Sequence, residues 1–109
     1  MKADVFESAV RKSGDMAGAF EYDGDTAYFY LYYIDEFKGN KVLDAIRIFS
    51  GNSELSELDV AVKWDKSEDK VGVFLRRELW AFFEVSTGKK FGGDYSDGGR
   101  SLIEVNQNF

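Results

Sequence analysis

The sequence predicts a mainly β fold, an antiparallel β-sandwich or open barrel of about six or seven strands with one short N-terminal helix. Three observations predict it. Short apolar segments alternate with turn-forming residues about every 8–12 residues, the spacing typical of all-β sandwiches and barrels. Those segments are rich in aromatic and β-branched residues, which favour strands. The chain contains no Pro, so Gly, Asp, Asn and Ser must form its turns.

The first segment, DVFESAVRK at residues 4–12, predicts a short amphipathic helix. Its apolar residues recur at helical spacing, and Asp4 stands where a helix N-cap is expected. The four apolar positions are Val5, Phe6, Ala9 and Val10. An opening strand is the alternative interpretation of the same residues.

A hairpin is predicted next, because the acidic turn DGD at 23–25 separates MAGAFEY at 16–22 from TAYFYLYYI at 26–34. The return strand is apolar on both alternating faces, which is typical of a central strand covered on both sides. One face carries Tyr28, Tyr30, Tyr32 and Ile34, and the other carries Ala27, Phe29, Leu31 and Tyr33. Each buried Tyr hydroxyl needs a hydrogen-bond partner. A half-exposed tyrosine layer that contacts a ligand or partner is therefore the alternative.

The remaining segments alternate between loops and strands. Residues 42–49, VLDAIRIF, fit either a helix or a strand, and their Ile, Val and Phe content favours a strand. A meander of three strands follows at 59–64, 71–77 and 79–85, with a reversal at Arg77 and Glu78. Loops are expected at 35–41, 50–58 and 92–99, and SLIEVNQNF at 101–109 closes the chain in alternating pattern.

The composition predicts a single domain over residues 1–109 and no enzyme. The chain has neither Cys nor His. A Ser-His-Asp triad, a Cys-His pair and a site with His or Cys metal ligands are therefore excluded. No motif indicates a cofactor, and the paired carboxylates lie in polar turns, where solvated surface is expected.

The charge balance argues against nucleic acid as a partner. The chain carries 14 basic and 20 acidic residues, a net charge of −6, and the imbalance is spread evenly along it. A basic stripe or tail is missing. Solubility explains the acidic balance, and an acidic face for a basic partner is the sharper interpretation. No apolar segment has the length of a membrane span or signal peptide, so a cytoplasmic protein is expected.

Four short motifs carry a resemblance to a known family. They are an acidic turn before a tyrosine-rich strand, an aliphatic strand, a Trp-Asp turn and an aromatic strand. The matching residues are Gly24, Asp25, Thr26, Tyr28, Phe29 and Tyr30; Val42, Leu43, Asp44, Ala45, Ile46, Ile48 and Phe49; Val62, Trp64 and Asp65; and Ala81, Phe83, Glu84 and Val85. Over residues 20–91 the chain resembles a small uncharacterised bacterial family. The resemblance implies a shared fold, and no catalytic residue follows from it.

Two candidate sites emerge from the sequence. A protein-binding surface is predicted from Tyr28, Tyr30, Tyr32 and Trp80, because Tyr and Trp are enriched at interfaces. The glycine-rich loop GGDYSDGG at 92–99 could hold a small ligand or a hard cation, through Asp94, Tyr95, Asp97 and Arg100. The leading hypothesis is a non-enzymatic protein-binding module, such as an immunity- or inhibitor-like protein. The alternatives are a small-ligand or metal-ion binding domain and a structural homodimer, and the protein is expected to be a monomer or homodimer.

Overall fold

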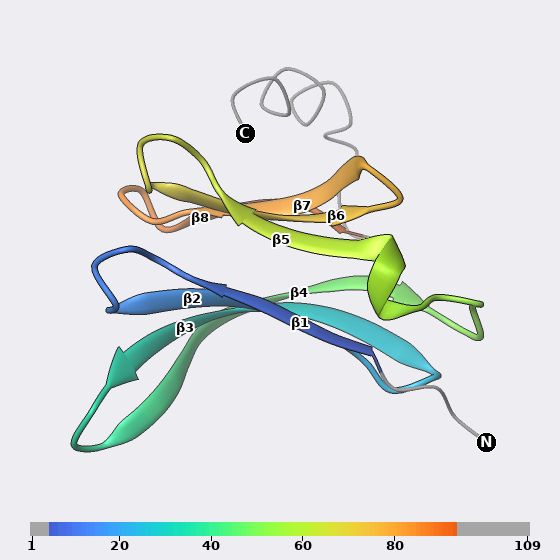
Figure 1. Cartoon of the computed structure of the whole chain (residues 1–109), viewed down its shortest axis with the longest axis horizontal. Coiled ribbons are helices and arrows are strands. Elements are labelled where there is room, and N and C mark those ends of the chain that lie inside the picture. Colours follow the sequence, from blue (N-terminus) through green and yellow to red (C-terminus); the bar gives the residue numbers. More distant parts are fainter. Residues whose placement is uncertain (1–4, 94–109) are drawn as a thin grey trace.

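The computed structural model describes residues 5–93, which form two four-stranded antiparallel sheets packed face to face (Figure 1). In each sheet the strands follow chain order, so every pair of neighbours is a hairpin. Sheet A contains β1 (Val5–Val10), β2 (Met16–Tyr22), β3 (Thr26–Asp35) and β4 (Gly39–Ser50). Sheet B contains β5 (Val60–Trp64), β6 (Lys70–Leu75), β7 (Glu78–Glu84) and β8 (Lys89–Gly92). The 3-10 turn η1 (Glu57–Asp59) lies on the connection between the sheets.

The predicted N-terminal helix is wrong, because Val5–Val10 forms strand β1. In the pairing of β1 with β2, successive side chains of β1 point alternately to the core and to solvent. Val5 faces the core at 2% exposure, while Phe6 and Val10 face solvent. The helical spacing of the apolar residues was accidental, and pairing with a neighbouring strand decides the structure.

The predicted sandwich is confirmed, and a closed barrel does not form. The predicted strands at 26–34 and 42–49 correspond to β3 and β4, although β4 already begins at Gly39, inside the predicted loop. Residues 5–93 form eight strands where the sequence predicts six or seven, because it predicts a helix in place of β1 and a turn in place of β8. Residues 101–109 lie outside the described part of the chain.

The core lies between the two sheets and is made of the inward-facing residues of both. Phe29 of β3 and Phe83 of β7 stack across the interface with ring centroids 5.2 Å apart. The other large side chains of this core that are almost completely buried are Phe20, Tyr22, Ile46, Ile48, Val71 and Val73. Phe82 is also buried, but it belongs to a separate cluster with Phe74 and Leu79 on the opposite face of sheet B. Only one face of β3, formed by Ala27, Phe29 and Leu31, contributes to this core.

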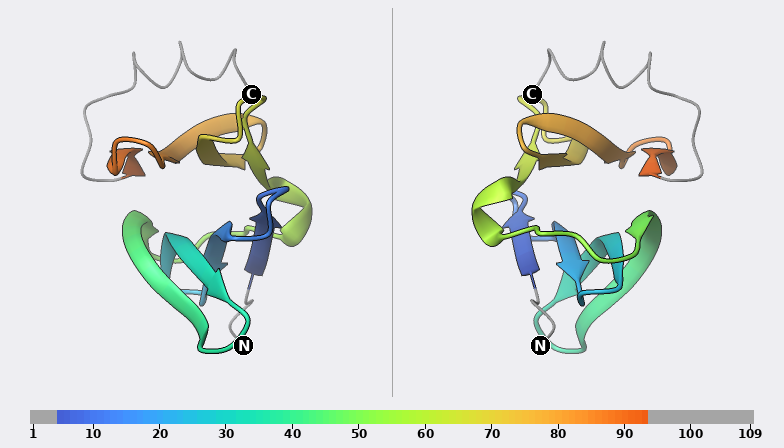
Figure 2. Two further views of the ribbon diagram at one scale, coloured as in Figure 1. Left: turned by 90° about the vertical axis from the view of Figure 1, so that its left-hand side faces the viewer. Right: turned by 90° about the vertical axis from the view of Figure 1, so that its right-hand side faces the viewer.

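The two sheets face each other as separate layers (Figure 2), and side-chain contacts join them along both edges. On one edge, Trp64 of β5 donates its indole N–H to the Ala9 carbonyl of β1 at 3.0 Å. Arg11 lies over the same Trp64 ring, 5.4 Å from its centroid. On the other edge, the Lys90 ammonium of β8 contacts Asp44 of β4 at 3.0 Å. The outer faces of the two sheets are consequently separate surfaces.

Gly18 of β2 lies where the two sheets pack closely against each other. A Cβ added there would lie 2.6 Å from Cγ2 of Val71 and 3.1 Å from Cζ of Phe29. We expect Gly18→Ala to lower the free energy of unfolding by about 1–2 kcal/mol, because the methyl group overpacks the core. Urea denaturation measures this loss. In a Val71→Ala background the same substitution should cost less, and an equal cost in both backgrounds would contradict the clash as its cause.

Candidate binding face

The tyrosines of β3 stand on the outer face of sheet A, opposite small residues of β2. Antiparallel register places Tyr30 beside Ala19 and Tyr32 beside Ala17, while Tyr28 lies beside Glu21. The three rings form a continuous row. Centroids are 5.8 Å apart between Tyr28 and Tyr30 and 5.9 Å apart between Tyr30 and Tyr32.

This row is half-buried, so the prediction that β3 is covered on both sides is wrong. The strand is central in sheet A, between β2 and β4, but sheet B covers only its other face. Ala17 and Ala19 also face outward and are nevertheless buried, because the side chains of the neighbouring strands stand higher than their methyl groups. The result is an aromatic row raised above a floor of small residues.

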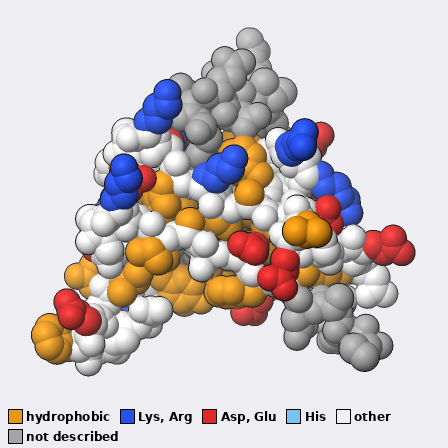
Figure 3. Space-filling view, viewed as in Figure 1, with side chains coloured by type: hydrophobic (Ala, Val, Ile, Leu, Met, Phe, Trp, Pro, Cys, Tyr) orange, Lys and Arg blue, Asp and Glu red, His pale blue; other side chains and the backbone are white. Residues whose placement is uncertain are grey.

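Exposed apolar residues of β1 and β4 lie on the same outer face, on either side of the row. Phe6 and Val10 of β1 are 54% and 58% exposed, and Val42 of β4, which pairs with Tyr32, is 48% exposed. We call this surface the tyrosine face; it comprises Phe6, Val10, Tyr28, Tyr30, Tyr32 and Val42. Figure 3 shows hydrophobic side chains gathered where sheet A reaches the surface, in the lower half of the view. Exposed apolar surface of this kind is typical of interaction sites.

Carboxylates lie near Tyr30 on the β2 side of the tyrosine face, while Arg47 of β4 lies beside Tyr28 on the other side. Burial raises the pKa of the Tyr30 hydroxyl, and the carboxylates of Glu21 and Asp23 raise it further, as do the adjacent tyrosines. The β2–β3 turn holds Asp23 in place, because its carboxylate accepts the backbone N–H groups of Asp25 and Thr26 at 2.8 Å each. A positive group near the row would be stabilised by the same carboxylates.

Trp80 is not part of the tyrosine face, although the sequence grouped them. It belongs to β7 in sheet B, at a register shift where Val73 pairs with Ala81 and Phe74 with Leu79. Its ring meets Phe49 edge-on at 6.3 Å, at the wall of a separate cavity of about 350 Å³. Trp80 lies at this bulge, and a bulge cannot be predicted from the alternation of apolar and polar residues.

The predicted ligand loop at 92–99 falls almost entirely outside the described residues. The four predicted ligand residues lie outside the described range: Asp94, Tyr95, Asp97 and Arg100. Gly92 and Gly93 are described, and both have positive φ values of 92° and 76°. Within residues 5–93, no group of three acidic side chains is arranged to hold a metal ion.

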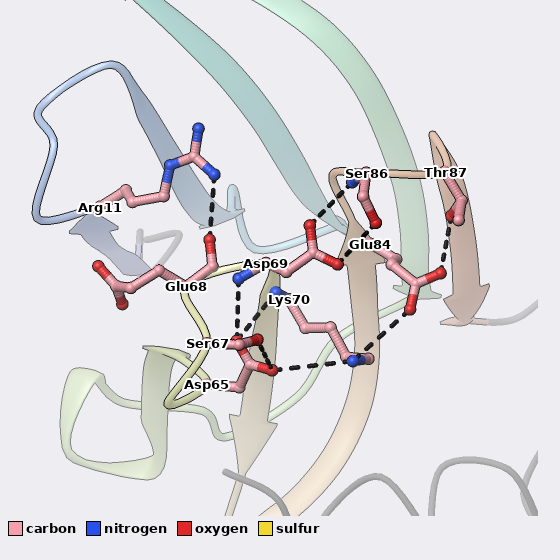
Figure 4. A network of polar contacts seen from close by, with 9 residues as sticks. All are labelled: Arg11, Asp65, Ser67, Glu68, Asp69, Lys70, Glu84, Ser86 and Thr87. Atoms are coloured by element: carbon pink, nitrogen blue, oxygen red, sulfur yellow. Dashed lines mark hydrogen bonds and ion pairs between the residues drawn. The ribbon is translucent and has the colours of Figure 1, made fainter.

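The most connected polar cluster lies at the β5–β6 turn, away from the tyrosine face (Figure 4). The buried Asp65 carboxylate accepts the backbone N–H groups of Asp69 and Lys70, each at 3.0 Å, and the Ser67 hydroxyl at 2.9 Å. Lys70 also lies 3.5 Å from Glu84 of β7. These contacts hold the β5–β6 turn together and join it to β7, so the role of the cluster is structural.

The contribution of β1 to the tyrosine face is not predicted from the sequence, because those residues are assigned to a helix. The available signal is the alternation of Phe6, Ser8 and Val10 with Val5, Glu7 and Ala9.

Among residues 5–93, no helix has the length and hydrophobicity needed to cross a membrane.

Comparison with known proteins agrees with the resemblance over residues 20–91 and extends it. No curated protein and no solved structure matched the chain. A profile of uncharacterised proteins conserved in bacteria, DUF2251, matches residues 2–92, which include every strand of both sheets. The chain therefore belongs to this uncharacterised bacterial family.

Proposed function

We propose that this protein is a non-enzymatic binding module whose tyrosine face takes a basic protein partner. The observation that carries the proposal is the half-exposed row of three tyrosines, with exposed Phe6 and Val10 beside it. Within residues 5–93, no strand or helix covers this side of sheet A. Aromatic residues are enriched at protein interfaces, so a half-exposed row of them supports a binding role.

The chemistry of the face favours a partner that presents Arg or Lys. Tyrosine rings supply large contact area with few rotatable bonds, and cations bind over their faces. Glu21 of β2 stands beside Tyr28, with Arg47 of β4 on its other side, and the net charge of the protein is −6. The carboxylate and the net charge favour approach of a positive surface. An immunity- or inhibitor-like protein that blocks a basic partner is one role of this kind.

The test is a titration with a short synthetic peptide in which Arg alternates with Leu, followed by NMR. We expect the tyrosine-face resonances to shift, and Tyr30→Ala to weaken binding about tenfold or more, because central aromatic residues dominate interfaces. Added salt should weaken binding too, since exposed charges are screened.

Tyr33→Ala supplies the matched control. Tyr33 lies on the same strand and is 45% exposed, but it belongs to the alternate side of β3. Its substitution should leave the peptide affinity unchanged. Equal weakening by Tyr33→Ala and Tyr30→Ala would refute a localised face. If instead the chain alone doubles its mass in sedimentation, and Tyr30→Ala restores the single-chain mass, the face joins two copies and the protein is a structural homodimer.

A further inference from the structure

The β6–β7 hairpin turns through two consecutive arginines in left-handed conformation. Arg76 has φ 50° and Arg77 has φ 72°. Two-residue hairpin turns with positive φ at both positions normally contain Asn-Gly or Gly-Gly, because a Cβ is strained there. Strained non-glycine residues persist mainly at functional sites. Two arginines at this turn therefore indicate that their side chains are used.

A groove of about 510 Å³ opens beside this turn, and we call it the arginine-turn groove. Its basic side chains are Lys63, Arg76 and Arg77, and the only acidic one is Asp59, which lies 3.8 Å from Arg76. The groove thus carries a surplus of positive charge on a protein whose net charge is −6. Within residues 5–93, no ion pair engages Lys63 or Arg77.

The remaining walls of the groove are apolar. Phe74 and Ala61 form part of its lining, and Leu58 at its rim is 98% exposed. The Lys63 ammonium lies 5.3 Å from the Phe74 ring centroid, so charge and apolar surface are adjacent. This combination suits a ligand that presents carboxylates and apolar side chains in turn. Guanidinium groups bind carboxylates through paired hydrogen bonds.

We propose that the arginine-turn groove binds an acidic, partly apolar peptide segment of a protein partner. Carboxylates of the segment pair with Arg77 and Lys63, and an apolar side chain contacts the exposed Leu58. The site lies on sheet B and selects the opposite charge from the tyrosine face, so it is independent of the function proposed above.

The test replaces both arginines with the residues that the turn prefers, Arg76→Asn/Arg77→Gly. The probe is a fluorescent synthetic peptide in which Glu alternates with Leu and Phe, and binding is measured by anisotropy. We expect the melting temperature to rise by about 4–8 °C, because strain is relieved. The peptide affinity should fall about tenfold or more, because the guanidinium groups are gone. Higher stability with lost binding cannot be attributed to misfolding.

A matched control removes the same charge elsewhere, with Lys66→Gln/Lys89→Gln on exposed positions outside the groove. This variant should bind the peptide as the parent does, and so should Tyr30→Ala. The proposal is overturned if the Asn-Gly variant keeps the parent affinity. It is also overturned if the lysine control loses as much affinity, since the attraction would then be unspecific charge.

Discussion

Phe29→Ala is expected to lower the free energy of unfolding by about 3–5 kcal/mol, which is a large share of the stability of a small domain. Phe29 is completely buried on β3, and its ring stacks on Phe83 of the opposite sheet. Truncation would leave a cavity between the two sheets. Neither sheet can collapse into this cavity without disturbing the backbone hydrogen bonds between its own strands. Guanidinium or urea denaturation, with circular dichroism as the signal, measures the loss.

The adjacent residue gives the control for this prediction. Tyr30 lies on the same strand but on the outer face, where it is half-buried. Tyr30→Ala should cost only about 1 kcal/mol, because cross-strand contacts are lost and no core cavity forms. Similar losses at positions 29 and 30 would mean that both faces of β3 are covered, which would contradict both the fold and the tyrosine face.

Local alternation predicts most of the strands, because at least one face of most of them is apolar and the turns between them are rich in Gly, Asp and Lys. Val5–Val10 is the exception, because its apolar residues fit both the helical and the strand period. Pairing with β2 decides between the two periods, and pairing is a non-local contact that the segment itself does not encode. Lys89–Gly92 is too short and too polar for its sequence to predict strand β8.

The candidate site was predictable only in part. The sequence placed Tyr28, Tyr30 and Tyr32 on one side of a strand, and the register confirms that they share a face. Which side of β3 meets the second sheet could not be predicted, because both sides are apolar. The turn at Arg76 and Arg77 could not be predicted either, because arginine rarely adopts the positive φ values that both residues have. The sequence indicated a reversal one residue later, at Arg77 and Glu78.

Asp65→Ala is the second substitution for which we expect a large effect, a loss of about 2–4 kcal/mol in the free energy of unfolding. Asp65 is the one buried polar or charged residue in the described part of the chain, 6% exposed, and it organises the β5–β6 turn. Its removal leaves the N–H groups of Asp69 and Lys70 without their acceptor. Thermal and chemical denaturation measure the loss. Asp44→Ala is the control, because its ion pair with Lys90 is solvent-exposed and should contribute about 1 kcal/mol or less.

The effect of Asp65 should also depend on pH, in a direction fixed by its hydrogen bonds. Burial alone would raise the pKa of its carboxyl group, but the N–H of Lys70, the Ser67 hydroxyl, the N–H of Asp69 and the charge of Lys70 outweigh burial and lower it. A carboxylate with a lowered pKa in the folded state stabilises the protein above its unfolded pKa of about 4. That contribution is lost as pH falls through the lower folded value. The stability gap between the parent and Asp65→Asn should therefore be constant near neutral pH and shrink below pH of about 4. A gap that stays constant into acid would show that hydrogen-bond geometry, and not the ionised carboxylate, holds the turn.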